Sequence, residues 1–359
     1  MKKLRVALIG TGNIGETHIT RYEANPNVEI AAVCDIDAEK LNKFADKHNI
    51  EARFTSVDEM LASVELDAAD VCVWNCSHAE CTIAALNAGL NVLCEKPMAM
   101  TAAEAQEMKD TADKNGKLLM LGFVTRFSNQ SRIAKDFIDN GYLGNIYYTK
   151  ATYVRRHGNP GGWFSDKSRS GGGPIIDIGV HPLDLTRYLM GNPKPVSVYC
   201  VAANELHEDR ANLKTHVGWA PEGADPKKDV CDVESSAVGI IRYENGASTL
   251  LECSYSLHDG RSTQDGGNGR ILYGTKGGLN LDTMMYYTDV NGFMVNSEIK
   301  DVDNYNEAKE GFRAEIDHFV DCCLNGTKCI SPAEDGVVIM KILEGLYESA
   351  RTGKSVDII

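Results

Sequence analysis

The sequence predicts an α/β protein that begins with a doubly wound parallel sheet and continues into a second domain. Three observations predict this. Short apolar runs alternate with helical patterns up to Phe123, a glycine-rich turn directly follows the first run, and hairpin-like strand patterns replace the alternation afterwards. Strands that alternate with helices of ten or more residues imply right-handed crossovers and a parallel sheet. The length of 359 residues fits two or three domains.

Five apolar runs are the expected strands of the first domain. They are residues 4–9, 29–35, 70–74, 91–95 and 117–123, and further helices are expected at 38–48, 78–88 and 101–115. Short continuous apolar runs are typical of strands that are buried on both faces. Thr101 and Glu104 form a capping-box pattern, which marks the start of the helix at 101–115.

The second domain shows longer strands and several helical patterns. A helix is expected at 129–140, strands at 145–156 and 196–203, a strand pair at 235–256, and a last helix at 334–350. Asn245-Gly246 is a strong hairpin signal within the strand pair, and Lys276-Gly-Gly278 is expected to be a turn. An apolar stripe at helical spacing predicts a core-facing helix; it comprises Phe312, Ile316, Phe319, Val320 and Cys323.

Composition excludes several classes of protein. The net charge of −14 at pH 7 argues against nucleic-acid binding, which needs clustered Lys and Arg. No apolar run is long enough to span a membrane, and no export signal is recognisable, so a cytoplasmic protein is expected. The eleven cysteines form no C-x-x-C pair. Neither a disulfide framework nor a metal site is therefore expected.

A glycine loop follows the first expected strand and opens the first helix. It reads Gly10-Thr-Gly12-Asn13-Ile14-Gly15. Gly10 permits the tight turn, Gly12 lets the backbone approach a pyrophosphate at the helix N-terminus, and Gly15 lets helix and strand pack closely. Asp35 stands at the end of the second strand, where an acidic residue accepts hydrogen bonds from the adenosine ribose. This combination predicts dinucleotide binding and favours NAD over NADP.

Two further motifs resemble the Gfo/Idh/MocA family (glucose–fructose oxidoreductase, inositol dehydrogenase and rhizopine catabolism). They are Cys94-Glu95-Lys96-Pro97 and Asp177-Ile-Gly179-Val-His181-Pro-Leu-Asp184. Together with the glycine loop, in this order, they extend the resemblance over essentially the whole chain. The segment Val73-Trp74-Asn75-Cys76-Ser77-His78 departs from the Thr-Pro-Asn of many members. Asn75 and His78 still match, and the resemblance implies that they contact the cofactor together with Glu95 and Lys96.

The resemblance also implies the domain organisation. Residues 1–123 would form the NAD-binding Rossmann domain, and residues 124–359 a substrate-binding and oligomerisation domain of α+β type. That domain would hold a large, open, mostly antiparallel sheet with one face towards the active site. The other face would make the contacts of a homo-oligomer, as a dimer, a tetramer or a larger assembly. The last helix could pack back on the first domain.

Lys96, Asp177 and His181 are the candidate catalytic residues. Lys96 follows a parallel strand at its carboxyl end, where open α/β sheets bind ligands, and a lysine there can stabilise developing negative charge. Asp177 and His181 share a face if their segment is helical, and histidine can accept a hydroxyl proton near neutral pH. A capped helix with a satisfied histidine explains the pattern equally well. The resemblance assigns all three as the catalytic set, with His181 as base, Asp177 as its partner and Lys96 orienting the hydroxyl.

The substrate pocket is expected to draw on residues 153–170, which end the strand at 145–156 and lead through a Gly/Pro loop to the catalytic helix. Its candidate residues are Tyr153, Arg155, Arg156, His157 and Trp163, beside Lys96, Asp177 and His181. Arg and His donate to sugar hydroxyls, and an aromatic face covers a pyranose ring. A solvated loop with one anchoring Trp is the alternative. The polar segment 204–230 could cover the pocket, extend an interface or form a surface loop.

The sequence therefore predicts an NAD-dependent dehydrogenase that reversibly oxidises a secondary ring hydroxyl of a glucoside or pyranose. Similar Arg-Arg-x-Gly-x-Pro-Gly loops occur in family members that oxidise glucosides, often at C3. The NAD could be tightly bound. Three alternatives stay open: a myo-inositol or other cyclic-polyol dehydrogenase, a glycosidase that uses NAD without net redox change, and a non-catalytic sensor of sugar or NAD.

Overall fold

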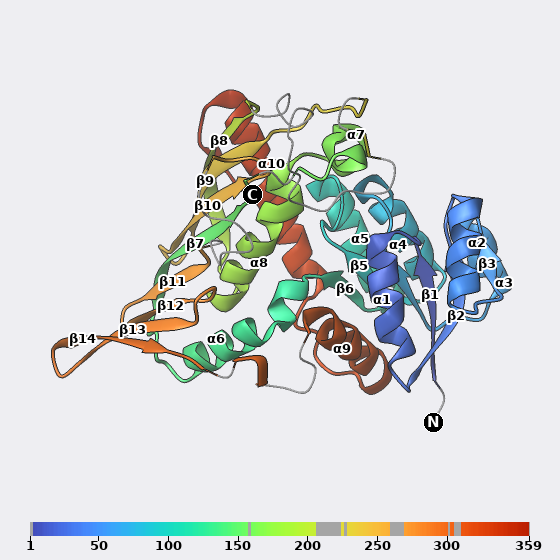
Figure 1. Ribbon diagram of the computed structural model, residues 1–359, viewed down its shortest axis with the longest axis horizontal. Coiled ribbons are helices and arrows are strands. Elements are labelled where there is room, and N and C mark those ends of the chain that lie inside the picture. The colour runs from blue at the N-terminus through green and yellow to red at the C-terminus, as the bar shows by residue number, and fades with distance from the viewer. Residues whose placement is uncertain are drawn as a thin grey trace. The chain divides into compact units, whose positions relative to one another are not determined.

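The computed structural model describes residues 3–156, 159–205, 224–225, 228–258, 269–300, 302–304 and 310–358. The chain forms two compact units (Figure 1): unit 1 is Met1–Phe127 with Glu310–Val337, and unit 2 is Ser128–Lys309 with Val338–Ile359. The chain therefore leaves unit 1 after Phe127, builds most of unit 2, returns to unit 1 at Glu310 and ends in unit 2.

A parallel sheet with the strand order β3-β2-β1-β4-β5-β6 is the centre of unit 1. Its strands are β1 Leu4–Ile9, β2 Val28–Cys34, β3 Arg53–Phe54, β4 Ala68–Val71, β5 Asn91–Glu95 and β6 Leu119–Gly122. The connecting helices are α1 Asn13–Glu23, α2 Ala38–Lys47, α3 Val57–Ser63, α4 His78–Asn87 and α5 Ala102–Asn115. The strand order reverses between β1 and β4, where such folds bind nucleotides. The predicted doubly wound fold is confirmed.

Local sequence signals located most elements of unit 1. β1 and β5 have the predicted bounds, and the capping box of α5 is formed: Thr101 Oγ1 accepts the Glu104 N–H at 3.2 Å, and Glu104 accepts the Thr101 N–H at 3.0 Å. β3 and α3 were not predicted. A strand of two residues carries no periodic pattern, and the seven residues of α3 are fewer than a clear helical pattern needs.

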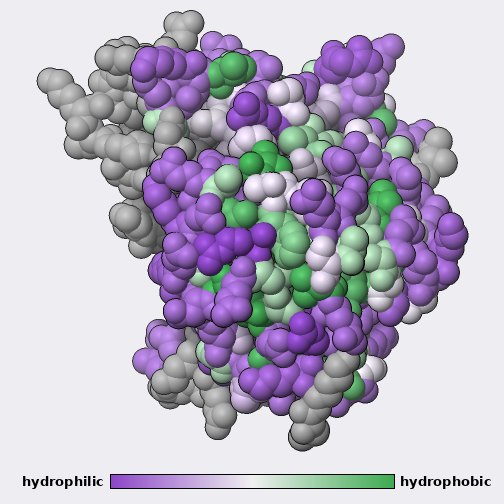
Figure 2. Space-filling view, turned by 90° about the vertical axis from the view of Figure 1, so that its right-hand side faces the viewer, coloured by the Kyte–Doolittle hydropathy of each residue, from purple (hydrophilic) through white to green (hydrophobic). Residues whose placement is uncertain are grey.

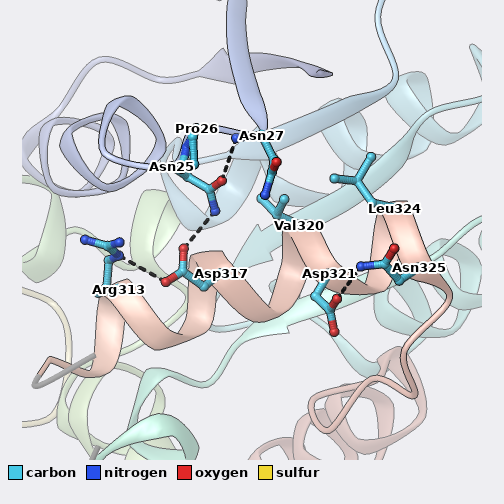
Figure 3. Close-up of a pocket in the computed structure, with 9 residues that line it drawn as sticks. All are labelled: Asn25, Pro26, Asn27, Arg313, Asp317, Val320, Asp321, Leu324 and Asn325. Atoms are coloured by element: carbon cyan, nitrogen blue, oxygen red, sulfur yellow. Dashed lines mark hydrogen bonds and ion pairs between the residues drawn. The ribbon is translucent and has the colours of Figure 1, made fainter. Parts of the chain in front are cut away.

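Helix α9 (Gly311–Asn325) belongs to unit 1 and packs against α1. The predicted stripe is confirmed at its centre, where Ile316, Phe319 and Val320 are buried. Asp317 of α9 accepts a hydrogen bond of 2.8 Å from Asn25, which lies in the turn that precedes β2. A shallow pocket lies between this turn and α9 (Figure 3). This return of the chain completes the core of unit 1.

Within the described residues, unit 2 is built on a sheet of nine strands in the order β14-β13-β12-β11-β7-β10-β9-β8-β15. The strands are β7 Ile146–Val154, β8 Pro195–Ala203, β9 Ser236–Tyr243, β10 Ser248–Ser254, β11 Ile271–Gly274, β12 Gly277–Asn280, β13 Met285–Val290, β14 Phe293–Glu298 and β15 Val356–Asp357. All neighbours except β7 and β10 run antiparallel. The expected open, mostly antiparallel sheet is confirmed.

The helices of unit 2 lie mainly on one side of this sheet in Figure 1. They are α6 Asn129–Asp139, α7 Lys167–Ser170, α8 Val180–Leu189 and most of α10 Ala333–Thr352. The predicted hairpin turn at Asn245-Gly246 is confirmed between β9 and β10. The predicted turn at Lys276-Gly-Gly278 is wrong in part: Lys276 lies in the turn, but both glycines belong to β12 and pair with β13. Glycine there allows close packing, because a Cβ on Gly277 would lie 2.7 Å from the Tyr286 ring.

Figure 2 shows one face on which purple hydrophilic residues surround green hydrophobic residues near the middle. Ile36 is an exposed apolar residue of unit 1, with 79% of its surface accessible. Among the described helices, none combines the length and the apolar character needed to cross a membrane.

Candidate active site

The glycine loop of unit 1 has the geometry that the sequence predicts. Gly10 has a φ of +102°, and a Cβ there would lie 2.4 Å from the Cys72 carbonyl oxygen. A Cβ on Gly15 would lie 2.2 Å from the Gly10 carbonyl oxygen, so this glycine sets the close approach of α1 to β1. A Cβ on Gly12, the N-cap of α1, would meet nothing within 4 Å. The space above the helix N-terminus is therefore open to an anionic group.

Asp35 lies at the end of β2 and is fixed towards this loop. One carboxylate oxygen accepts the Thr11 N–H and the Thr11 hydroxyl, each at 2.8 Å, and the other accepts the Asp37 N–H at 2.9 Å. An ionised carboxylate offers about four lone-pair sites, so Asp35 retains acceptor capacity for a ribose hydroxyl. Thr11 was not singled out from the sequence, although it stands inside the loop.

Lys96 follows β5 and starts the turn that contains the cis Lys96–Pro97 peptide bond. The Glu95 carboxylate accepts the Lys96 N–H at 3.0 Å. His78 holds the other side of the turn: Nδ1 lies 2.6 Å from the Pro97 carbonyl oxygen, and Nε2 lies 3.1 Å from that of Val73. Burial lowers the pKa of His78, although its contacts with the two carbonyl groups oppose this effect. The structure gives His78, which is 1% exposed, a positioning role for the turn.

A buried network lies behind Glu95. His18 Nδ1 is 2.8 Å from the Asp70 carboxylate, and His18 Nε2 is 3.3 Å from that of Glu95. Burial alone would lower the pKa of His18, but Asp70 raises it well above the ordinary value. Burial would likewise raise the pKa of Glu95, but the His18 contact and the charges of His18 and Lys96 lower it. The His18 ring thereby lies against the Glu95 carboxylate, and Glu95 fixes the backbone of Lys96.

In unit 2, Asp177 and His181 stand where a π-helical turn (Ile175–Gly179) passes into α8. Such turns are frequent at functional sites. The preceding glycines fit tightly, since a Cβ on Gly173 would lie 2.3 Å from the Glu234 carbonyl oxygen. The Glu234 carboxylate accepts the N–H groups of Gly173 and Ile175, each at 3.0 Å. Glu234 therefore anchors the start of the turn that presents Asp177.

The side chains around Asp177 form one cluster of unit 2. Tyr255 donates a hydrogen bond of 2.8 Å to Asp177, and both side chains are buried. The Arg155 guanidinium lies 5.2 Å over the Tyr153 ring, and the Tyr153 and His181 ring centroids are 6.4 Å apart. Burial would lower the pKa of Arg155, but nearby Tyr153 and Asp177 raise it, so this group stays cationic.

The fold thus brings together four of the residues predicted from unit 2: Tyr153, Arg155, Asp177 and His181. Tyr255 was missed, because it follows an apolar strand and its contact with Asp177 spans 78 positions. Glu234 was missed because its contacts with Gly173 and Ile175 span 61 and 59 positions.

The remaining candidates of the substrate loop are less closely tied to this cluster. The Trp163 ring packs at a tilt against that of Phe164 with ring centroids 3.8 Å apart, and Arg156 is exposed. His157 and most of the segment 204–230 lie outside the described residues. The roles expected for Arg156, His157 and Trp163 therefore stay predictions.

The parallel sheet, the glycine loop at its switch point and the acidic residue after β2 define unit 1 as a dinucleotide-binding domain. Residues 4–123 match an oxidoreductase family with an NAD-binding Rossmann fold, and residues 135–358 match the C-terminal alpha/beta domain of the same family. The chain belongs to the Gfo/Idh/MocA oxidoreductase family, which confirms the resemblance seen in the sequence.

Individual relatives resemble the whole chain. A D-glucoside 3-dehydrogenase of Escherichia coli is 34% identical over 99% of this chain and 97% of its own length. A myo-inositol 2-dehydrogenase of Thermotoga maritima is 26% identical over 75% of each chain. The crystal structure of an aldose–aldose oxidoreductase from Caulobacter crescentus superimposes with a TM-score of 0.80 at 25% identity, covering 99% of this chain and 100% of its own.

Proposed function

We propose that this protein is an NAD-dependent dehydrogenase that oxidises a secondary ring hydroxyl of a glucoside, at C3, to the keto sugar. The 34% identity to a D-glucoside 3-dehydrogenase over nearly the full length of both chains carries this proposal. The cluster around Asp177 supports it, because Arg155, Tyr153 and Tyr255 combine hydrogen-bonding groups with aromatic surface, as a sugar requires.

NAD fits the residues of unit 1. The amides of the glycine loop would hold the pyrophosphate at the N-terminus of α1, where Gly12 leaves room for it. Asp35 would hold the adenosine ribose and disfavour a 2′-phosphate. The exposed side chain of Ile36 directly after it offers an apolar surface for the adenine. The bound nicotinamide supplies one piece of chemistry, the acceptance of a hydride from the carbinol carbon.

Residues of this chain would accept and return the hydroxyl proton. As the C–H bond breaks and the hydride leaves, the hydroxyl proton passes to His181, and a C=O bond forms at the same carbon. Lys96 would donate a hydrogen bond to the reacting oxygen, orient it and stabilise the negative charge that develops there. Asp177, held by Tyr255, would orient the sugar or the imidazole. The reverse reaction returns the proton from His181 to the alkoxide oxygen.

A substrate panel tests this proposal. Methyl α- and β-glucosides should produce NADH, measured by its absorbance, and borodeuteride trapping with mass spectrometry should place the ketone at C3. His181→Ala should abolish turnover while NAD binding, measured by calorimetry, stays unchanged. Turnover of His181→Ala at the wild-type rate would refute the assigned role of the base. Trapped deuterium at another carbon would refute C3 oxidation.

A cyclic polyol is the second candidate substrate, favoured by the similarity to a myo-inositol 2-dehydrogenase. The same panel separates the two, since myo-inositol carries no anomeric substituent. A higher kcat/KM with myo-inositol than with any glucoside would support it. Release of the aglycone without accumulated NADH would instead indicate a glycosidase, and inactivity towards every polyol would indicate a sensor.

We further propose that the protein is a homo-oligomer in the cytoplasm. The outer face of the unit 2 sheet exposes four apolar side chains in adjacent cross-strand pairs, Tyr199 with Ile240 and Val201 with Val238. Each is 44–56% exposed, and a contiguous apolar patch of this kind is typical of an interface. All eleven cysteines are free, which fits a reducing compartment. Light scattering of the wild type and of Ile240→Glu would test the assembly, because the charge should dissociate it.

A further inference from the structure

Two thiols and an imidazole form a cluster in unit 1 that the proposed reaction does not use. His318 and Cys322 are four positions apart on α9 and so share a face of the helix. Cys329 comes from the loop that follows α9. One ligand atom of each residue lies within 4.8 Å of the other two. Cys322 Sγ and His318 Nε2 are 3.4 Å apart.

The loop that carries Cys329 is held in place by contacts that do not involve its thiol. Arg126 donates a hydrogen bond of 2.5 Å to the Ile330 carbonyl oxygen. The Ser331 hydroxyl donates one of 2.7 Å to the Leu121 carbonyl oxygen. Arg126 is itself buried and paired with Asp335 at 2.9 Å. The fold therefore fixes Cys329 next to α9 before any ligand binds.

We propose that His318, Cys322 and Cys329 form a binding site for a thiophilic divalent metal ion of the zinc type. Zinc binds nitrogen at about 2.0–2.1 Å and sulfur at about 2.3 Å, and tetrahedral angles then place the two ligand atoms about 3.6 Å apart. The observed separation of 3.4 Å needs little adjustment. Three protein ligands leave a fourth position for water or another small ligand.

Burial at the cluster suits a metal ion that enters from solvent. Cys322 is 8% exposed, whereas His318 and Cys329 are each partly exposed, so an ion can reach the site and lose most of its water there. The other two groupings that could hold a metal in the described chain both use His18, whose ring is fully buried and already paired with Asp70. The cluster on α9 is therefore the more suitable site.

Binding changes the protonation and the hydrogen bonding of the cluster. Each cysteine binds the ion as a thiolate, and any proton that its thiol carries passes to solvent. His318 Nε2 now accepts the Ile330 N–H at 3.1 Å, and the metal takes that lone pair. The contact between Cys322 and His318 and the hydrogen bond from Ile330 to His318 are exchanged for three coordinate bonds. The bound ion joins α9 to the loop that leads into α10, and this link would stabilise unit 1.

Cobalt spectroscopy of the reduced, full-length, untagged chain tests the proposal directly. One equivalent of Co²⁺ should produce a thiolate-to-cobalt charge-transfer band together with intense d–d bands of tetrahedral coordination. Zn²⁺ should abolish these bands at one ion per chain, and it should raise the midpoint of thermal unfolding. Absence of the charge-transfer band in the wild type would overturn the proposal, whatever the behaviour of any variant.

Single substitutions locate the site. Cys322→Ser and Cys329→Ser should lose the charge-transfer band and weaken Zn²⁺ binding, measured by chelator competition, by at least about 10–100-fold. Cys323→Ser is the matched control, because Cys323 is the next residue of α9 but its thiol contacts Asn91 instead. This variant should bind as the wild type does. Circular dichroism and NADH formation should be unchanged in all three. A band that survives in both Cys322→Ser and Cys329→Ser, but is lost when the exposed Cys76 is replaced, would overturn the assignment.

Discussion

Replacing Tyr255 with Phe should separate the contribution of one hydrogen bond from the rest of the site. The substitution removes only the hydroxyl that donates to Asp177 at 2.8 Å, and the ring of Tyr255 is fully buried. A hydrogen bond to a charged group contributes about 1.5–3 kcal/mol. If Asp177 must keep its orientation in the transition state, kcat/KM for the glucoside should fall by about 10–150-fold, since 1.36 kcal/mol is a factor of ten.

Steady-state NADH formation measures the fall in kcat/KM, and urea unfolding measures the loss of stability. Tyr243→Phe is the matched control, because its hydroxyl lies 3.1 Å from the Thr249 hydroxyl inside the sheet and touches no candidate catalytic residue. It should cost about 1 kcal/mol of stability and leave kcat/KM unchanged. A Tyr255→Phe enzyme whose kcat/KM stays within about twofold of the wild type would refute the positioning role of Tyr255.

Three further predictions concern the glycine loop, the buried network and the start of the catalytic turn. Gly12→Ala should fold normally but bind NAD at least about tenfold more weakly in calorimetry, because the added Cβ fills only the open space above the helix. Gly15→Ala should instead lower the melting temperature sharply, because its Cβ would meet the Gly10 backbone. Burial lowers the pKa of His18, but Asp70 outweighs burial and raises this pKa in the folded state. Protonated His18 therefore contributes its full stabilisation below its usual pKa of 6.5, and this contribution is lost as the pH rises through the folded-state pKa. Thermal melts should therefore fall at alkaline pH, and Asp70→Asn should remove that dependence and cost about 3–5 kcal/mol. Glu234→Ala, which leaves two amides of the turn without their acceptor, should lower kcat more than it changes KM; an unchanged kcat would contradict its role.

The sequence carried enough information for the first half of the fold because the signals there are local. The strands that became β1 and β5 are apolar runs with clear ends, and Thr101 with Glu104 marks the start of α5 through contacts only three residues apart. At Lys276 the local signal misled, since glycine pairs are typical of turns but here allow the Tyr286 ring to pack on β12. Packing of that kind is decided by strands that lie elsewhere in the chain.

Only the site residues that lie in sequence motifs could be predicted. The glycine loop, Lys96, Asp177 and His181 are carried by motifs with fixed spacing. Tyr255, Glu234 and His18 are not, because each acts through a partner dozens of positions away. His78 shows a related limit: the motif placed it at the cofactor, but only the fold reveals that its ring is buried against two carbonyl groups. The proximity of Cys329 to α9 likewise depends on how Ser331 pairs with β6.

The return of the chain to unit 1 at Glu310 has a consequence for the order of events during synthesis. When the ribosome has made the first 127 residues, His18 still lacks the Phe312 ring that packs 5.7 Å from it, and the sheet lacks the buried face of α9. A nascent chain must then carry this incomplete core while nearly two hundred further residues emerge. Unit 1 can close only after α9, which begins directly after Glu310, has emerged. The stretch before Glu310 is therefore the interval in which the apolar residues that α9 covers in the folded protein stay uncovered.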